Sequence, residues 1–416
     1  MDASHTYPKL RWPIDLRLHD AAGKRVLVLQ CPLGISEKPL VLVPAVGPIL
    51  SLFDGSRSRE QILAQFGPQG LTEKTLTELI LLLDQHLFLA NGKFFAAGQE
   101  AREAFERADV RSPALAGRAY PAEAAQLKGL VDSCLVEAPA SEANDAEVAC
   151  LVAPHIDYQR GGRCYGVTYP ELRRSSSDLF VLMGTAHQYS AGIFHLCAKD
   201  FESPLGKLPC DTDFMTKLAA RYGVERSFKE QFLHKREHSL ELQLPFVSSL
   251  KPGASIAPIL VGSLHRAVVE QRAPQEIDEY ESLVGALCEV LLEREAAGRK
   301  VCFIAGVDMA HVGKSFGDED SLTLQKMEKV AARDREYLSA IERLDASALF
   351  THICEDGDAR RICGFPTMYT ILDLFSRLNR RPAVKLISYD QAVDYPGECA
   401  VTFAGMAMFE RESQKN

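Results

Sequence analysis

Short apolar runs alternate with stretches of helical periodicity along most of the chain. Runs such as VACLVA at 148–153 and VCFIAGV at 301–307 are typical of strands buried on both faces of a sheet. The pattern predicts strands at 148–153, 179–183, 255–261, 301–307, 384–389 and 400–408. It predicts helices at 121–136, 213–222, 237–249, 276–297, 321–342, 346–355 and 365–378. This alternation favours an α/β fold with a largely parallel sheet flanked by helices.

The first part of the chain has a different pattern. It predicts strands at 24–30 and 39–43, helices at 59–66 and 72–86, and a hairpin at 87–96 turning at Asn91-Gly92. Helices followed by such a hairpin are typical of a winged-helix α+β domain. We therefore expect a small winged-helix domain at 1–96, a polar helical linker at 97–116 and the α/β domain at 117–412.

Length and charge narrow the class of protein. A chain of 416 residues is longer than one core usually serves, which agrees with two domains. The net charge of −9 argues against nucleic-acid binding, which needs a basic patch. The sequence shows neither a signal-peptide layout nor an apolar run long enough for a membrane span, so we expect a cytoplasmic protein without membrane contact. Eleven scattered cysteines without a CxxC pair argue against a zinc ribbon.

Potential metal ligands follow three of the predicted strands. His155 comes after 148–153, His187 after 179–183, and Asp308 and His311 after 301–307. Ligands of open α/β sheets bind beyond the carboxyl ends of the strands. Neutral imidazole is the most common protein ligand of transition metals. The sequence therefore places these side chains at one crevice.

Two further residues carry chemistry. Cys363 stands before Gly364 and Pro366 at the opening of an apolar helix, where the helix dipole lowers the pKa of a thiol and favours a metal-binding thiolate. His238 lies between Glu237 and Glu241 on the predicted helix 237–249. A lone histidine on an apolar helix face is more often structural than catalytic.

Six segments occur in one order and carry a resemblance. They are PHIDY, GTAH, EHSLE with LPF after it, APILVG, GVDMAH and CGFP. Together they closely resemble the MEMO family over about residues 117–410. Bacterial members of that family are known as AmmeMemoRadiSam system protein B. The family shares its fold with LigB-like class III extradiol dioxygenases, which are non-haem iron enzymes.

The resemblance implies roles for particular residues. Metal ligands would be His155, His187 and Cys363. Acid–base groups would be His238, Asp308 and His311. Asp157, Tyr158 and Glu237 would lie around the metal ligands or in the substrate pocket. PHIDY, where other members often have PHAGY, adds the Asp157 carboxylate, and GTAHQ retains one histidine of the usual GPSHH. A cysteine in place of the dioxygenase glutamate suits copper or zinc better than oxygen-activating iron, although it does not exclude iron.

The N-terminal part carries a second resemblance. LFDGSRSREQILAQF, a further helix and HLFLANGKFF are similar to PqqD-like modules, which are winged helices that bind short peptides. A DNA-reading winged helix is the alternative, but the acidic helix TEKTLTELILLLDQ disfavours phosphate contact. The resemblances imply a peptide or protein partner and, from the family name alone, a radical SAM enzyme.

Three functions remain open at this point. The first is a metal-dependent oxidoreductase using iron or copper. The second is a non-catalytic scaffold that binds a peptide, a protein or a metal and works with a radical SAM partner. The third is a structural zinc site, in which Asp308, Asp157 or His238 would complete the ligand set.

Overall fold

The computed structural model describes residues 3–21, 23–36, 38–135 and 146–410. The chain forms two compact units: unit 1, Met1–Ala108, and unit 2, Asp109–Asn416. Residue 136, the last of the predicted helix 121–136, lies outside the described residues, as do residues 411 and 412 of the predicted second domain. None of the helices in the described ranges combines the length and the apolar character that a membrane crossing requires.

Unit 2 is built on an eight-stranded mixed sheet of order β12-β14-β5-β11-β6-β10-β7, with β13 paired to β14. The central strands are parallel: β5 (Val148–Ala153), β11 (Val301–Gly306), β6 (Leu179–Thr185) and β10 (Ser255–Val261). The outer strands are antiparallel: β7 (Phe194–Leu196), β12 (His311–Val312), β13 (Ala383–Asp394) and β14 (Cys399–Phe409). The largely parallel sheet that we expected is therefore limited to the centre, because a short turn joins β13 to β14 and makes them a hairpin.

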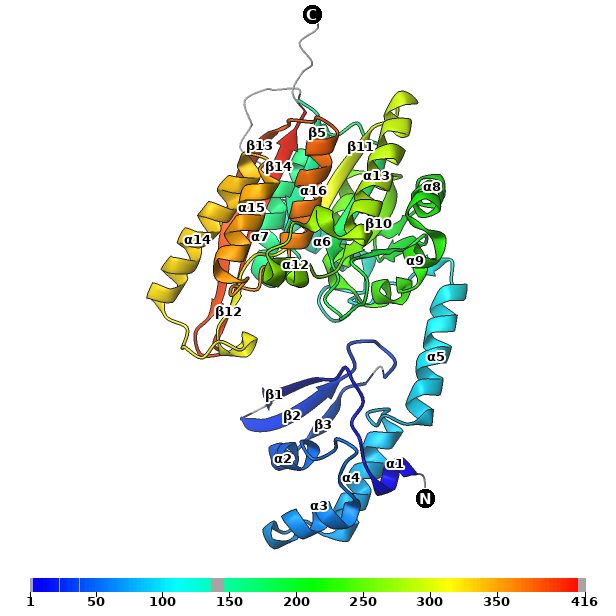
Figure 1. Cartoon of the computed structure of the whole chain (residues 1–416), viewed down its shortest axis with the longest axis vertical. Helices are drawn as coiled ribbons and strands as arrows, with labels where there is room; N and C mark the ends of the chain where they lie inside the picture. The colour runs from blue at the N-terminus through cyan, green and yellow to red at the C-terminus, as the bar shows by residue number, and fades with distance from the viewer. Residues whose placement is uncertain (1–2, 22, 37, 136–145, 411–416) are drawn as a thin grey trace, which may run out of the picture. The chain divides into compact units, whose positions relative to one another are not determined.

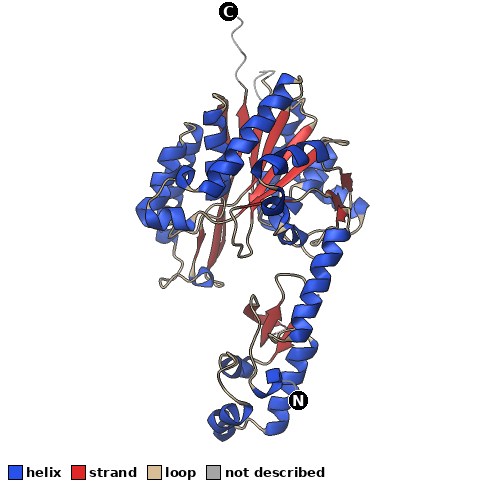
Figure 2. Cartoon of the chain, turned by 45° about the vertical axis from the view of Figure 1, so that its right-hand side comes forward, coloured by secondary structure: helices blue, strands red, loops and turns tan. Residues whose placement is uncertain are grey.

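Helices cover both faces of this sheet (Figure 2). Leu179, Val181 and Met183 of β6 belong to the core cluster that includes residues of α8, α13 and α16. The next residue, Gly184, faces the opposite side and lies against Ser239 of α10. The helices are α6 (Ala124–Cys134), α7 (Tyr158–Thr168), α8 (Thr212–Tyr222), α9 (Val224–Phe228), α10 (His238–Glu241), α11 (Leu244–Leu250), α12 (His265–Glu270), α13 (Asp278–Ala296), α14 (Leu324–Glu342), α15 (Ala346–Asp356) and α16 (Phe365–Arg377).

Two helical segments of unit 2 differ from the sequence prediction. The single helix expected at 237–249 is divided into α10 and α11, because Pro245 lacks an amide hydrogen and its ring excludes the continuation of the preceding turn. Helix α7 was not predicted, since Gly161, Gly162 and Gly166 weaken its helical signal. A small separate sheet contains β4 (Val110–Arg111), β8 (Asp200–Ser203) and β9 (Gly206–Leu208).

Unit 1 contains an antiparallel sheet of β1 (Asp15–Ala21), β2 (Lys24–Gln30) and β3 (Leu40–Leu42). Its helices are α1 (Ala3–Thr6), α2 (Gly47–Leu50), α3 (Arg59–Phe66), α4 (Glu73–Gln85) and α5 (Gly92–Arg107). The core joins Leu27 and Leu29 of the sheet to Ile62 of α3 and Leu76 of α4. The chain thus buries one face of a short sheet against helices.

The hairpin predicted at 87–96 is wrong. Asn91 caps helix α5 instead, with its side-chain oxygen accepting a hydrogen bond from the Phe94 amide at 3.1 Å. Asn-Gly is typical of a tight hairpin turn, but asparagine is equally favoured at a helix N-cap. A wing after α4 is therefore missing from the described part of unit 1, and the winged-helix prediction is not confirmed.

Candidate metal centre

The parallel strands bring three segments to the same edge of the sheet. Gly306 of β11 is paired with Ala153 of β5 on one side and with Gly184 of β6 on the other. His155 follows two residues after Ala153, and His187 three residues after Gly184. The strands therefore end at one edge of the sheet, as their predicted parallel arrangement requires.

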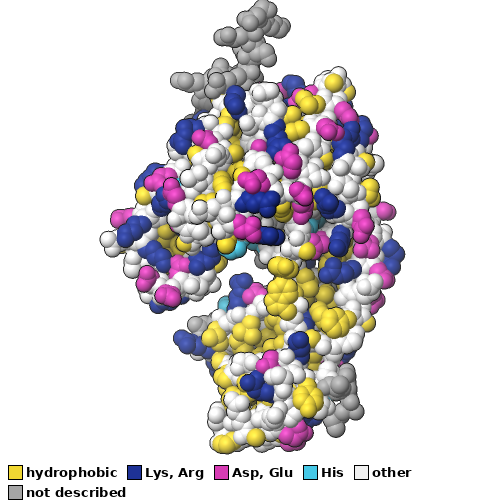
Figure 3. All heavy atoms as spheres, viewed as in Figure 1, with side chains coloured by type: hydrophobic (Ala, Val, Ile, Leu, Met, Phe, Trp, Pro, Cys, Tyr) yellow, Lys and Arg dark blue, Asp and Glu magenta, His cyan; other side chains and the backbone are white. Residues whose placement is uncertain are grey.

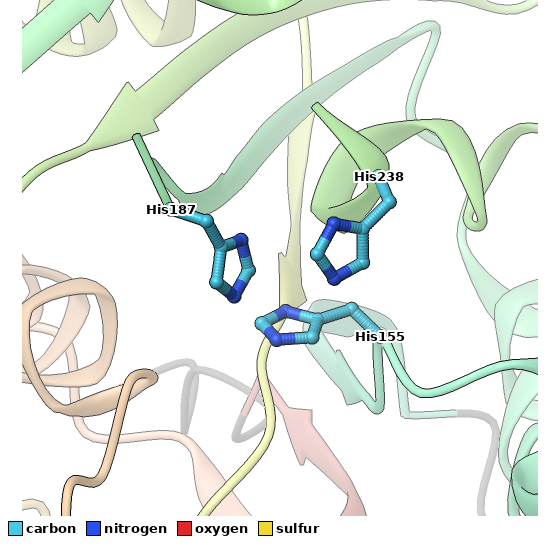
Figure 4. Close-up of side chains that lie close together, drawn as sticks. All are labelled: His155, His187 and His238. Atoms are coloured by element: carbon cyan, nitrogen blue, oxygen red, sulfur yellow. The ribbon is translucent and has the colours of Figure 1, made fainter. Parts of the chain in front are cut away.

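Three imidazoles meet at this edge: His155, His187 and His238 (Figure 4). One potential ligand atom of each lies within 4.8 Å of those of the other two. The ring centroid of His155 is 4.8 Å from that of His187 and 5.1 Å from that of His238. The rings of His187 and His238 are stacked, with centroids 4.3 Å apart. His238 thus belongs to the same group as the two histidines that follow the strands.

Two glycines allow His238 to reach this group. Gly184 and Gly306 are neighbours on adjacent strands, and a β-carbon on either one would collide with Ser239 of α10. Without those β-carbons, α10 lies directly on the ends of β6 and β11. The Ser239 hydroxyl donates a hydrogen bond to the Thr185 carbonyl at 2.8 Å, which fixes the helix there.

The contacts of His155 leave one ring nitrogen directed at the centre. Nδ1 donates to the Gly306 carbonyl oxygen at 2.9 Å, since a carbonyl can only accept. The lone pair is therefore on Nε2, which lies 3.3 Å from the Cys363 sulfur and 3.7 Å from a carboxylate oxygen of Asp308. The other Asp308 oxygen accepts a hydrogen bond from the His155 amide at 2.8 Å. Backbone and carboxylate contacts of this kind are typical around metal-binding histidines.

Glu237 orients the other two imidazoles. Its Oε1 lies 2.9 Å from His187 Nδ1 and 3.2 Å from His238 Nδ1. Its Oε2 accepts a hydrogen bond from the His187 amide at 2.9 Å, and Oε1 accepts one from the Ser239 amide. With both Nδ1 atoms facing this buried carboxylate, the Nε2 atoms of His187 and His238 are available to an ion.

Cys363 lies where the sequence placed it, immediately before α16. Besides its contact with His155, its sulfur lies 3.7 Å from the Asp308 carbonyl oxygen. The Thr185 hydroxyl donates a hydrogen bond to the Cys363 carbonyl at 3.0 Å and so ties this loop to the end of β6. The side chains of His155, His187 and Cys363 therefore converge.

Burial and neighbouring charges shift the pKa values of these groups in different directions. Burial, reinforced by the charge of His187, lowers the pKa of His155 well below its usual value and that of His238 to about 4. Burial also lowers the pKa of His187, but the Glu237 carboxylate outweighs it and the net pKa is raised. Burial raises the pKa of Asp308 to about 7, and it raises the pKa of the Cys363 thiol despite the opposing effect of His187. Two of the three imidazoles are thus neutral at neutral pH, as metal ligands must be.

The remaining predicted residues occupy the surroundings. His311 Nδ1 donates to the carbonyl oxygens of Met309 and Arg361, and burial together with the charge of His187 lowers its pKa to about 4. Asp157 caps α7 and pairs with Arg160, and the Tyr158 hydroxyl donates to the Leu242 carbonyl. Asp157 and Tyr158 therefore make contacts that anchor α7, whereas Glu237 contacts two imidazoles directly.

A pocket of about 200 Å³ opens beside Cys363. Its walls include Thr185 and Ala186 at the end of β6, Leu264 after β10, and Ile362 and Phe365 around the cysteine. A pocket of this size accommodates a small organic molecule. Cys363 lies on its wall, whereas the three imidazoles are not among its lining residues.

The donor set fits a transition-metal ion. Three imidazoles with fixed Nδ1 contacts converge, and the Cys363 sulfur and an Asp308 carboxylate oxygen lie beside the His155 Nε2 atom. Nitrogen and sulfur donors suit copper, zinc or iron. The sequence assigned His238 an acid–base role, with completion of a zinc ligand set as the alternative, and gave no geometric reason for its place beside the other two imidazoles. Gly184 near the end of β6 and Gly306 at the end of β11 were the available signal, because glycine in a strand indicates close approach of another backbone.

Comparison with known proteins agrees with the resemblance. A family model described as Memo-like protein matches residues 111–407. A MEMO1 family protein of Aquifex aeolicus is 26% identical, with 92% of this chain and 96% of the relative covered. Another from Methanobrevibacter smithii is 25% identical over 70% of this chain and 95% of the relative. Because the family model spans well over half of the sequence, the chain belongs to the Memo-like protein family.

Proposed function

We propose that unit 2 binds a single transition-metal ion through His155, His187 and His238, with Cys363 as the next donor. The observation that carries the proposal is the convergence of three imidazoles whose Nδ1 atoms are already engaged by Gly306 and Glu237. Such contacts set the tautomer and direction of a ligand before the ion arrives.

The pocket beside Cys363 favours a catalytic metal over a structural one. A bound iron or copper ion would supply redox chemistry there. Imidazole donors suit both metals, and the thiolate suits copper better than iron. Asp308 and His311, which lie beside the imidazoles, are the groups that would hold or move a proton. We therefore propose a metal-dependent oxidoreductase acting on a small substrate; the relationship to LigB-like dioxygenases remains a prediction. A closed tetrahedral zinc site is the alternative.

Metal analysis of three variants tests the ligand set. We expect His155→Ala and His238→Ala to lose the ion, and Cys363→Ser to bind it with lower affinity and an altered absorption spectrum. His86→Ala in unit 1 is the matched control, since it removes an imidazole far along the chain from this group. If His238→Ala retains all of its metal and Cys363→Ser loses it, the third ligand is Cys363 and not His238.

Unit 1 supports a second function, which is binding of an extended peptide or protein segment. Strand β1 is at the edge of the three-stranded sheet, and Leu16 and Leu18 on it are 46% and 63% exposed. Figure 3 shows apolar side chains gathered on unit 1. An edge strand with exposed leucines fits a partner that adds a strand and contributes alternating apolar residues. A peptide substrate, or a segment of a radical SAM enzyme, would be a partner of this kind.

The single tryptophan of the chain stands three residues before β1 in the sequence. Trp12 lies in unit 1 and is 69% exposed. We expect its fluorescence to change when a synthetic peptide of alternating valine and threonine is added, and Leu18→Lys to weaken that response. Leu292→Lys, at an exposed leucine of unit 2, is the control. An equal response in both variants would contradict binding at β1.

A further inference from the structure

A completely buried ion pair involves the helix that carries His238. Arg111 is close to the beginning of unit 2, and its guanidinium pairs with the Glu241 carboxylate. Both side chains are 0% exposed. Charges are rarely buried unless they are paired and hydrogen-bonded, so the remaining contacts of this pair indicate what it holds.

Arg111 contacts two backbone carbonyls in the segment that leads into α10. Its Nε donates to the His234 carbonyl at 2.9 Å, and Nη2 donates to the Glu237 carbonyl at 3.0 Å. A planar guanidinium makes these contacts in fixed directions, and a lysine ammonium does not reproduce them. The chain leading into α10 is therefore attached to Arg111 at two carbonyl groups.

Glu241 binds the segment that follows Arg111. Its Oε2 accepts a hydrogen bond from the Ala114 amide at 3.0 Å. Its Oε1 accepts hydrogen bonds from the Leu115 amide at 2.7 Å and the Tyr120 hydroxyl at 2.5 Å. Residues 111–120 and helix α10 thus form one hydrogen-bonded assembly.

Helix α10 needs such support. It contains only four residues, His238–Glu241, and a single helical turn does not hold its own geometry in water. Yet its N-cap is Glu237, whose carboxylate contacts His187 and His238, and its first residue is His238 itself. A small rotation of this turn would move two of the three imidazoles relative to His155.

We propose that Arg111 is a positioning residue of the metal centre. By holding the Glu237 carbonyl and, through Glu241, the other end of α10, it sets the direction of His238 and of the carboxylate that orients His187. The inference rests on the metal site proposed above. It adds that the geometry of this site depends on a residue that contacts none of the three imidazoles in the described structure.

Cobalt(II) binding to the full chain tests this role. We expect Arg111→Lys to reduce Co²⁺ affinity about tenfold or more, as loss of an outer contact does at other metal sites, and to alter the visible absorption of the bound Co²⁺. The matched control is Arg294→Lys. Arg294 is also a buried arginine of unit 2, and it pairs with Asp211 at 2.8 Å and Asp178 at 3.0 Å. Both variants are expected to lower the melting temperature, but only Arg111→Lys should change the Co²⁺ spectrum.

The outcomes separate the two proposals. If wild-type protein does not bind Co²⁺, the metal site itself is refuted. If wild type binds it and folded Arg111→Lys has the same affinity and spectrum, only the positioning role is overturned. Should Arg111→Lys fail to fold, Glu241→Gln retains an oxygen acceptor for the Leu115 amide while removing the charge. An unchanged Co²⁺ spectrum in that variant would equally refute the proposal.

Discussion

The sheets of the two units differ in how they are buried. Every residue of β5, β6 and β11 in unit 2 is buried. In unit 1, the buried Leu27 and Leu29 of β2 alternate with half-buried residues, and the leucines of β1 are exposed. A strand packed on both faces has little freedom to shift, so side chains just beyond its end keep their positions. The comparison teaches that unit 2 is suited to hold ligands in fixed geometry, while unit 1 has surface left to bind a partner.

The largest expected effect concerns the rigidity of the central sheet. Phe303 lies on β11 with no exposed surface and packs against Phe375 of α16 with ring centroids 5.8 Å apart. Phe303→Ala should lower the free energy of unfolding by about 3–5 kcal/mol, because it removes buried apolar surface and leaves a cavity. Leu18→Ala on the exposed β1 should cost less than about 0.5 kcal/mol. Urea titration of both variants measures the difference; equal losses would invalidate the contrast between the two sheets.

The next effect is the pH dependence of metal binding. Glu237 raises the pKa of His187. Below that raised pKa His187 is protonated, and a metal ion must displace the proton in order to bind. The pKa values of His155 and His238 are lowered, so these two imidazoles stay neutral and add no dependence between pH 7.5 and 5.5. Affinity should therefore fall about tenfold per pH unit below the pKa of His187, as loss of one proton requires. Co²⁺ titrations across this range test it, and a flat profile would count against histidine ligation.

A thiolate ligand would alter this slope. The pKa of Cys363 is raised by burial, so its ligation would release a second proton near neutral pH. The slope of the logarithm of metal affinity against pH is compared between wild type and Cys363→Ser. If the slope is the same in both, the sulfur is not a ligand. If the variant releases one proton fewer on binding metal, the sulfur is a ligand.

A smaller effect is expected from the carboxylate behind the imidazoles. Glu237→Gln keeps an oxygen that accepts a hydrogen bond but removes the charge beside His187 and His238. We expect metal affinity to fall about 10- to 100-fold, in the range typical for such outer contacts. The pH profile should also shift to lower values, because the pKa of His187 is no longer raised. Glu230→Gln, near His195, is the control, and identical behaviour of the two variants would show that Glu237 has no special role.

The sequence predicted the part of the site that depends on the parallel strands. Three apolar runs become β5, β6 and β11, and the chain direction alone then brings His155, His187 and Asp308 to one edge. The position of His238 was not predictable in the same way. It depends on the break before Pro245 and on the absence of β-carbons at Gly184 and Gly306, which are effects of tertiary packing. The MEMO resemblance was needed to single out Cys363 as a partner of these histidines.

Unit 1 was predicted less well for a local reason. The Asn91-Gly92 pair is compatible with a hairpin turn and with a helix start, and no short-range pattern separates them. The structure selects the helix because Phe94 is buried on α5. The sequence also did not predict that the outer strands of unit 2 are antiparallel. An apolar run indicates a buried strand but not the direction of the strand beside it.

The central claim is tested most directly by measuring the metal content of purified full-length protein by elemental analysis, beside His155→Ala. The account predicts one transition-metal ion per chain in the wild type and its loss in the variant, with the circular dichroism spectrum unchanged. A folded His155→Ala protein that retains the same metal stoichiometry as the wild type would contradict it.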